Sequence, residues 1–324
     1  MKDSFGREID YLRLSVTDRC NLRCIYCMGE EGVEWKPHGE MLSFEELERL
    51  CVLFAALGIQ KIKITGGEPL VKKGVVPFIM RVRRIPGITD VTLTTNGVLL
   101  EDYLDDLAAA GVSSVNVSLD SLDRLVFQKL SGRDAFDRVS AAIHAAIRKN
   151  FRVKINAALL RGLNDEGIED FALFARDNGV CVRFIELMPL GAASAYEMVS
   201  SGEVLQKVSR VIKDLAPTGE RQGNGPAVYY TSPGMKGKIG FIGAMSSCFC
   251  TTCNRLRLDC LGRLKPCLSS GLSRDLKALV RGGADDAALK EAIRETARLK
   301  PEAHIFADRT NAALRGTAMF KIGG

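Results

Sequence analysis

Near its start the chain reads Tyr11-Leu-Arg-Leu-Ser-Val-Thr17 and continues directly with Asp18-Arg-Cys-Asn-Leu-Arg-Cys-Ile-Tyr-Cys-Met28. Apolar residues alternate over residues 11–17, which predicts a β-strand. Cys20, Cys24 and Cys27 follow within eight residues, with no fourth cysteine or histidine nearby. Zinc and ordinary iron–sulfur sites usually take four protein ligands, so this spacing favours a cluster with one iron left open for chemistry. The alternative is a thioredoxin-like redox pair of Cys24 and Cys27, which the third cysteine disfavours.

Strand-like and helix-like runs alternate over the first two thirds of the chain. The strands are expected at 11–17, 61–65, 91–96, 114–119, 152–160 and 181–188, and the helices at 44–57, 75–84, 103–110, 136–149, 167–177 and 204–215. Six consecutive strand–helix units predict a parallel sheet, either an open barrel or a doubly wound sheet. Polar or glycine-rich segments follow five of the six strands, where such folds bind ligands. From about Ala216 the composition changes to Gly/Pro-rich loops and short strands, so we predict two domains, 1–215 and 216–324.

Composition narrows the class of protein. The apolar content of 46% among 324 residues supports a well-buried core, and we expect a cytoplasmic protein without a signal peptide or membrane span. The ten cysteines are then expected as thiols or cluster ligands instead of disulfides. With only three histidines, a metal site must be built mainly from sulfur. The net charge of +6 fits an anionic small substrate as well as nucleic acid.

A second cysteine group near the C-terminus also stops at three members. It consists of Cys250, Cys253 and Cys267, and Arg255 and Arg257 follow its CxxC pair. Because it lies far along the chain from the first group, we interpret it as a second cluster. The alternative is a structural zinc site that recruits Cys248 or Cys260 as the fourth ligand.

The CxxxCxxC spacing, with Tyr26 before the last cysteine, resembles the signature of the radical S-adenosylmethionine enzymes. The resemblance implies an incomplete (β/α)6 TIM-like barrel whose mouth is covered by a C-terminal α+β module. It implies a [4Fe–4S] cluster on the first cysteine group, whose open iron chelates S-adenosylmethionine and whose electron cleaves it to a 5′-deoxyadenosyl radical. The cofactor contacts that it implies are Tyr26, Gly67 of the Gly66-Gly-Glu-Pro69 turn, Ser118 and Met188. From residue type alone, this turn also fits an ordinary strand–helix connection and Met188 fits core packing.

Three features resemble those of the members of this family that cyclise GTP at the start of molybdenum cofactor biosynthesis. They are the run FCxxCNRxRL, the third cysteine fourteen positions later, and the terminal Gly-Gly. In them the radical removes hydrogen from C3′ of GTP, and C3′ then bonds to C8 of the guanine. The resemblance implies a second [4Fe–4S] cluster that binds the guanine, an electron-donor protein, a downstream cyclic pyranopterin synthase and a homodimer.

The same resemblance implies two further sets of residues. The GTP contacts are Arg13, Lys63, Thr94, Lys154, Arg255 and Arg257. The catalytic set is Arg255, Arg257 and the Gly323-Gly324 tail, with Arg183 as a further candidate. Lys63 departs from the family pattern, where many members carry arginine, and it can serve a phosphate only as a point charge. Arg13 and Lys154 also fit ordinary surface ion pairs.

Two alternative functions belong to other classes. A radical peptide- or protein-modifying maturase would have more cysteines in the C-terminal module and gives Arg255 and Arg257 no role. A zinc-bearing nucleic-acid-binding protein needs a basic stripe with aromatic residues, but the aromatic content is only 6% and the cations are dispersed. We therefore expect neither a nucleic acid nor a membrane as partner.

Overall fold

The computed structural model describes residues 1–29, 35–220, 222–308, 311, 314 and 319–322. Within these residues, twelve strands form one sheet in the order β12-β11-β10-β1-β2-β3-β4-β5-β6-β9-β8-β7. Gly323 and Gly324, which the sequence predicts as catalytic, lie outside the described residues.

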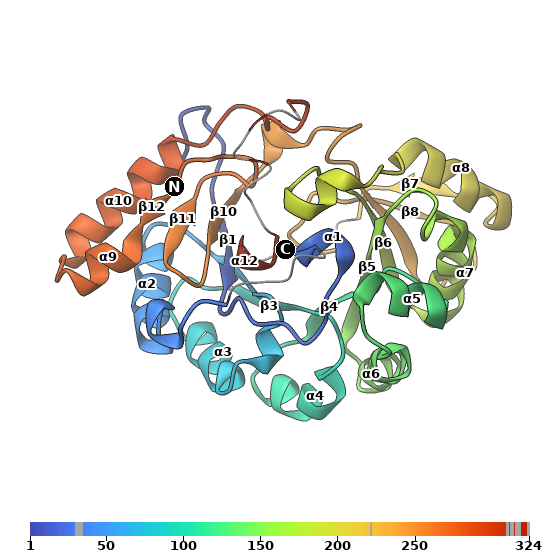
Figure 1. The fold of residues 1–324 in the computed structure, drawn as a ribbon, viewed down its shortest axis with the longest axis horizontal. Helices are drawn as coiled ribbons and strands as arrows, with labels where there is room; N and C mark the ends of the chain where they lie inside the picture. The colour runs from blue at the N-terminus through green and yellow to red at the C-terminus, as the bar shows by residue number, and fades with distance from the viewer. Residues whose placement is uncertain (30–34, 221, 309–310, 312–313, 315–318, 323–324) are drawn as a thin grey trace.

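The centre of the sheet confirms the predicted parallel barrel. Strands β1 to β6 pair in chain order and are all parallel, and the connecting helices lie on the outer side of the curved sheet (Figure 1). The strands are β1 (Tyr11–Ser15), β2 (Lys61–Thr65), β3 (Asp90–Thr95), β4 (Ser114–Ser118), β5 (Arg152–Leu159) and β6 (Cys181–Glu186). The helices are α2 (Phe44–Ala56), α3 (Val75–Arg83), α4 (Leu100–Ala109), α5 (Arg124–Ser131), α6 (Phe136–Arg148), α7 (Ile168–Asn178) and α8 (Ser201–Val211).

The C-terminal part of the chain extends this sheet at both edges. β9 (Lys238–Ile242) pairs parallel with β6, and β10 (Arg255–Leu258) pairs parallel with β1. The outer strands are antiparallel, namely β7 (Ala216–Thr218), β8 (Val228–Thr231), β11 (Arg263–Lys265) and β12 (Arg274–Asp275). The helices α9 (Leu276–Arg281) and α10 (Asp286–Arg298) follow. The predicted boundary between residues 215 and 216 stays a prediction, and strands from its two sides share one sheet.

Side-chain caps determine where several helices begin. At the start of α2, Ser43 Oγ accepts a hydrogen bond from Glu46 N, and the Glu46 carboxylate accepts one from Ser43 N at 2.7 Å. This capping box satisfies two backbone donors that the helix leaves free. The sequence did not predict α5, whose eight residues bury little besides Phe127 and Leu130 and whose first turn is capped by Asp123. None of the described helices is both long and apolar enough to cross a membrane.

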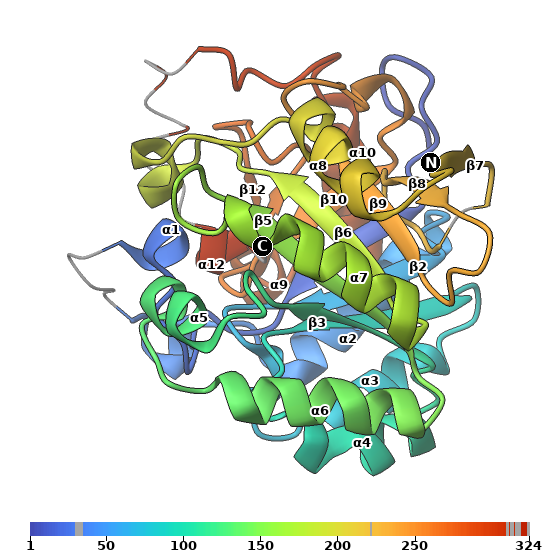
Figure 2. The ribbon, with the colours of Figure 1, turned by 90° about the vertical axis from the view of Figure 1, so that its right-hand side faces the viewer.

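Two short helices lie on the concave side of the sheet. They are α1 (Ile25–Met28), directly after the first cysteines, and α12 (Met319–Ile322), the last described segment. Figures 1 and 2 both place them side by side, and the Phe320 ring packs edge-on against Trp35 at 6.0 Å between centroids. The main hydrophobic core fills the layer between the sheet and its outer helices. The concave side is thus left for polar chemistry.

Gly237, which precedes β9, tests how the C-terminal strands join the barrel. A Cβ atom at this position would lie 2.0 Å from Val180 O and 2.4 Å from Ala175 O. Gly237→Ala should therefore lower the free energy of unfolding by about 2–3 kcal/mol, measured by urea denaturation of the full chain. Gly219→Ala is the matched control, because no atom lies within 4 Å of its added methyl group. Equal midpoints for the two variants would contradict this packing.

Candidate active site

A cavity of about 320 Å³ lies at the carboxyl ends of the parallel strands. Every predicted site residue that the structure describes lines it. These residues are Arg13, Cys20, Cys24, Tyr26, Cys27, Lys63, Gly67, Thr94, Ser118, Lys154, Arg183, Met188, Cys250, Cys253, Arg255, Arg257 and Cys267. The fold therefore brings both cysteine groups and the predicted cations, which are far apart in sequence, to one cavity.

The first cysteine loop is seated on the turn that follows β2. Gly67 N donates to Thr17 O at 2.8 Å, and Glu68 N donates to Arg19 O at 2.7 Å. A Cβ atom on Gly67 would lie 2.3 Å from Arg19 O, so only glycine permits this contact. The structure thus explains why position 67 requires glycine independently of the predicted cofactor contact. The missing side chain lets the loop that carries Cys20 approach the turn.

Buried carboxylates hold the rest of this loop. Glu68 is fully buried and accepts hydrogen bonds from Asn96 N, Thr95 Oγ1 and Leu70 N, and burial raises its pKa to about 7. The Asn96 side chain in turn donates toward Cys20 Sγ at 3.6 Å. On the opposite side, Tyr26 donates its hydroxyl hydrogen to Asp120 Oδ2 at 2.6 Å. The Tyr26 hydroxyl is therefore occupied, which leaves its ring and backbone for a ligand.

The three thiols of the first group fit a metal cluster by their chemistry. Burial raises the pKa of Cys20 and Cys24, and burial together with neighbouring Cys20 raises that of Cys27 to about 12. Three thiolates crowded in a buried loop need positive charge to be stable, and bound iron supplies it. Leu22 N and the Asn96 amide also point at Cys20 Sγ, as donors do at cluster sulfurs.

The second cysteine group is anchored to the barrel by Glu186 at the end of β6. Its carboxylate accepts hydrogen bonds from Ser201 N, Met245 N and Ser246 N, and from Ser246 Oγ. Burial alone would raise the pKa of Glu186, but these hydrogen bonds outweigh it and lower the pKa. The loop that leads to Cys250 is therefore tied to a strand of the barrel.

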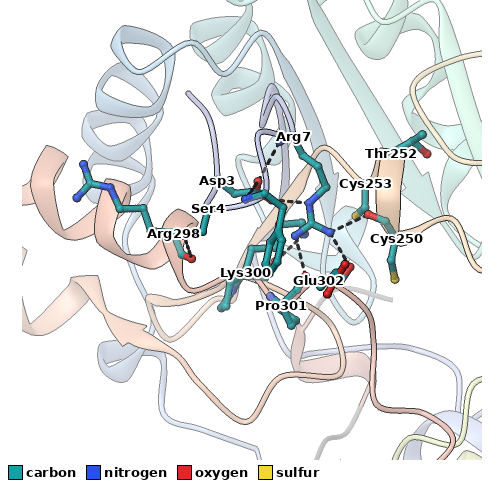
Figure 3. A network of polar contacts seen from close by, with 12 residues as sticks. Asp3, Ser4, Arg7, Cys250, Thr252, Cys253, Arg298, Lys300, Pro301 and Glu302 are labelled. Carbon is teal, nitrogen blue, oxygen red and sulfur yellow. Dashed lines mark hydrogen bonds and ion pairs between the residues drawn. The ribbon is translucent and has the colours of Figure 1, made fainter.

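Two further cations hold the other side of this loop. Arg7, paired with Asp3, donates to Cys250 O at 2.8 Å and to the carbonyls of Pro301 and Glu302 (Figure 3). Lys300 Nζ donates to Arg255 O and to Pro266 O, both at 2.8 Å. These contacts gather the segments that carry Cys250, Cys253 and Cys267 around common partners.

The sequence did not predict these supporting residues, and the reason differs between them. Asp120 and Glu186 lie in polar segments at strand ends, so a signal was present in the sequence. Arg7 binds backbone carbonyls 243 to 295 residues away and Lys300 binds carbonyls 34 and 45 residues away, and no local pattern marks such contacts.

Cys253 differs electrostatically from the other cluster candidates. Burial alone opposes its ionisation, but Arg255 and Lys300 outweigh burial and lower its pKa to about 6. The Arg255 guanidinium points Nε and Nη2 at Cys253 Sγ, each at 3.4 Å. This residue is therefore ready to bind a metal as a thiolate near neutral pH.

Cations cover the strands beneath the two cysteine groups. Three of them, Arg257 on β10, Arg13 on β1 and Lys63 on β2, are paired in register and form a row across the strands. Residues paired in this way have their side chains on the same face of the sheet. Lys154 and Arg183 add positive charge from β5 and β6. Lys63, Lys154, Arg183 and Arg257 are each less than one tenth exposed.

Four of these cations, Lys63, Lys154, Arg183 and Arg257, form no ion pair with a carboxylate of the described residues. In addition, Arg183 Nε and Arg257 Nη1 are buried without a hydrogen-bond partner. Burial, reinforced by the neighbouring cations, lowers the pKa of Lys63 and Arg257 well below the usual values and that of Lys154 to about 8. Such an arrangement fits an anion, because a bound phosphate would supply both the charge and the acceptors.

Two protein families match the chain. Residues 14–175 match the Radical SAM superfamily, and residues 180–306 match the family described as Molybdenum Cofactor Synthesis C. The fold and the cysteine-lined cavity agree with this class, the radical S-adenosylmethionine enzymes. Among solved structures, Streptococcus suis SuiB bound to S-adenosylmethionine has a TM-score of 0.60 at 17% identity, over 89% of this chain and 68% of that chain. This likeness supports the partial barrel fold.

Relatives identify the branch within this class. The GTP 3′,8-cyclase of Thermodesulfovibrio yellowstonii is 45% identical over 309 residues, which cover 93% of this chain and 95% of the relative. The GTP 3′,8-cyclases of Heliobacterium modesticaldum and Clostridium perfringens are 43% and 40% identical, and both alignments cover 100% of each chain. The chain belongs to the GTP 3′,8-cyclase family.

The low pKa of Cys253 gives a pH-dependent prediction. In cluster-free protein, alkylation of Cys253 by iodoacetamide should rise through a midpoint near pH 6, because the reactive thiolate forms above this pKa. Arg255→Gln removes the main opposing charge, so the midpoint should move up toward the ordinary thiol value of about 8.5. Mass spectrometry of labelled peptides measures both midpoints, and Arg274→Gln, on the exposed edge strand β12, is the control. An unchanged midpoint in Arg255→Gln would show that Arg255 does not lower the pKa of Cys253.

Proposed function

We propose that this chain converts GTP to (8S)-3′,8-cyclo-7,8-dihydroguanosine 5′-triphosphate, the first step of molybdenum cofactor biosynthesis. The observation that carries the proposal is the set of buried cations without carboxylate partners on the wall of a cavity that also holds both cysteine groups. Membership of the GTP 3′,8-cyclase family supports it. A triphosphate is the kind of polyanion that such a wall selects.

The cysteine groups hold two [4Fe–4S] clusters in this proposal. Cys20, Cys24 and Cys27 hold the first, and Cys250, Cys253 and Cys267 hold the second. Bound at the first group, a reduced cluster supplies the electron that cleaves S-adenosylmethionine to a 5′-deoxyadenosyl radical. The chain's own contribution is placement. Tyr26 of α1, Gly67 after β2, Ser118 at the end of β4 and Met188 after β6 are the proposed cofactor contacts, and all of them line one cavity.

The cations bind and orient the substrate. Arg13, Lys63, Lys154 and Arg183 hold the triphosphate, while Thr94 contacts the nucleoside from the end of β3. Arg257, in register beside Arg13, adds a phosphate contact from β10, whereas Arg255 lies next to Cys253 of the second cysteine group, which holds the guanine. Fixing both ends of GTP places the ribose and C8 together, a proximity effect that supplies several kcal/mol of a barrier.

The C-terminal segment closes the cavity from the concave side. Met319 and Phe320 of α12 line the cavity opposite the strands, and Phe306 contributes a second apolar wall. Apolar walls keep water and stray hydrogen donors from a reactive intermediate. Gly323 and Gly324, which follow α12, remain part of the proposed catalytic set as a tail that helps to order the arginines.

The alternative functions are less well supported. The likeness to SuiB concerns the fold, so it does not favour a peptide-modifying maturase over GTP cyclisation. The proposal further includes an electron-donor protein, a downstream cyclic pyranopterin synthase and a homodimer, which rest on the family, and a cytoplasmic location, which rests on the sequence.

Arg257 tests the phosphate site. Arg257→Gln should weaken GTP binding by about 10- to 100-fold, because a buried charge-assisted hydrogen bond is lost. Binding of guanosine, which has no phosphate, should change little. Anaerobic calorimetry on the reconstituted protein measures both affinities, with Arg263→Gln on the exposed neighbouring strand as control. Equal losses for GTP and guanosine would place Arg257 away from the phosphates.

Turnover tests the function itself. Reconstituted, reduced protein should form 5′-deoxyadenosine from S-adenosylmethionine only when GTP is present, together with the cyclised nucleotide. Cys267→Ala should abolish the cyclised product and leave some uncoupled cofactor cleavage, whereas Cys51→Ala, on the outer helix α2, should keep the product. Liquid chromatography with mass spectrometry detects both compounds. Normal cyclisation by Cys267→Ala would refute the role of the second cluster.

A further inference from the structure

Cys248, Cys250 and His304 form a cluster that the proposed function does not use as a unit. One ligand atom from each residue lies within 4.8 Å of the other two. Cys248 and Cys250 lie on the loop after β9, and His304 comes from the segment after α10 that Arg7 ties to Cys250. Three segments of the fold, including the N-terminal arm, thus act together to bring these atoms close.

The three atoms lie close enough together for a single ion to bind all of them after small side-chain movements. A tetrahedral Zn²⁺ with Zn–S near 2.3 Å and Zn–N near 2.0 Å holds its ligand atoms about 3.5–3.8 Å apart. The ligands of an iron–sulfur cube bind different irons and therefore stand further apart. Within the described residues, neither predicted cysteine triplet brings its three sulfurs as close as this cluster.

One ring nitrogen of His304 is held by a backbone carbonyl, which leaves the other as the candidate ligand. Its Nε2 lies 2.7 Å from Ala244 O, so Nε2 carries the hydrogen and donates it to this carbonyl. Nδ1 is then the nitrogen with the free electron pair, and it accepts only a long contact of 3.4 Å from Phe306 N. A backbone carbonyl that fixes the second ring nitrogen is the usual outer partner of a metal-bound histidine.

The cluster also has an entry path and an open position. Cys248 is exposed, whereas Cys250 is buried, so an ion can arrive from solvent and be held against the cavity wall. Two thiolates and one imidazole leave a fourth position for water, as in zinc sites with three protein ligands. Binding of the ion releases the two thiol protons to solvent.

We propose that Cys248, Cys250 and His304 bind a single Zn²⁺ in the cluster-free chain, in competition with the second iron–sulfur cluster. Competition arises because Cys250 belongs to both ligand sets. The zinc site itself does not depend on GTP chemistry, and its test uses neither GTP nor S-adenosylmethionine. It also differs from the zinc site considered from the sequence, which would use Cys253 and Cys267.

The experiment titrates the cluster-free, full-length chain anaerobically with Co²⁺, and then displaces Co²⁺ with Zn²⁺. The proposal predicts one Co²⁺ per chain with absorption bands of tetrahedral thiolate coordination. Cys248→Ala and His304→Ala should weaken Zn²⁺ binding at least about a hundredfold, since even outer partners of metal ligands are worth about 10- to 100-fold. Cys267→Ala and Cys260→Ala should bind Zn²⁺ like the parent chain.

Reconstitution provides the second measurement. Equimolar Zn²⁺ added before iron and sulfide should lower the iron content of the parent chain but not that of Cys248→Ala, which keeps all six predicted cluster ligands. Circular dichroism confirms that each variant is folded. Parent-like Zn²⁺ affinity in either Cys248→Ala or His304→Ala, loss of binding in Cys267→Ala, or absence of tetrahedral Co²⁺ bands in the parent chain would each overturn the proposal.

Discussion

Repulsion among buried cations is the constraint on which the rest of this structure depends. Arg13, Lys63 and Arg257 lie in register on adjacent strands, and Lys154 and Arg183 face the same cavity. Like charges taken out of water destabilise a fold unless an anion joins them. The barrel tolerates them because its core lies on the other face of the sheet, where apolar side chains pack against the outer helices. The site is thus built for a ligand with several negative charges.

The supporting contacts explain how two distant cysteine groups come to share one cavity. The turn after β2 seats the first loop through the small size of Gly67 and the backbone hydrogen bonds of its neighbours. Glu186, Arg7 and Lys300 each form hydrogen bonds to the segments that carry the second cysteine group. These three residues bind mainly backbone groups, so they fix the position of the loop chiefly through its backbone. Among the thiols, that of Cys253 also interacts with Lys300 and Arg255.

Local pattern accounts for what the sequence predicted, and distance along the chain accounts for what it did not. The six parallel strands were predicted within a few residues, because alternation in strands such as residues 61–65 is a local signal. The position of β10 beside β1 was not predicted, since four residues pair with a strand about 240 positions away. α5 was missed because its apolar face is short. Resemblance located the cavity-lining residues, whereas Arg7 and His304 became visible only when folding brought them to the second cysteine loop.

The most direct measurement is a crystal structure of the anaerobically reconstituted protein with GTP, with anomalous diffraction recorded at the iron edge. The account predicts two iron cubes, one on Cys20, Cys24 and Cys27 and the other on Cys250, Cys253 and Cys267. It also predicts the triphosphate among the cations of β1, β2, β5 and β6 and beside Arg257 of β10. A single cube, or a triphosphate bound away from these cations, would contradict it.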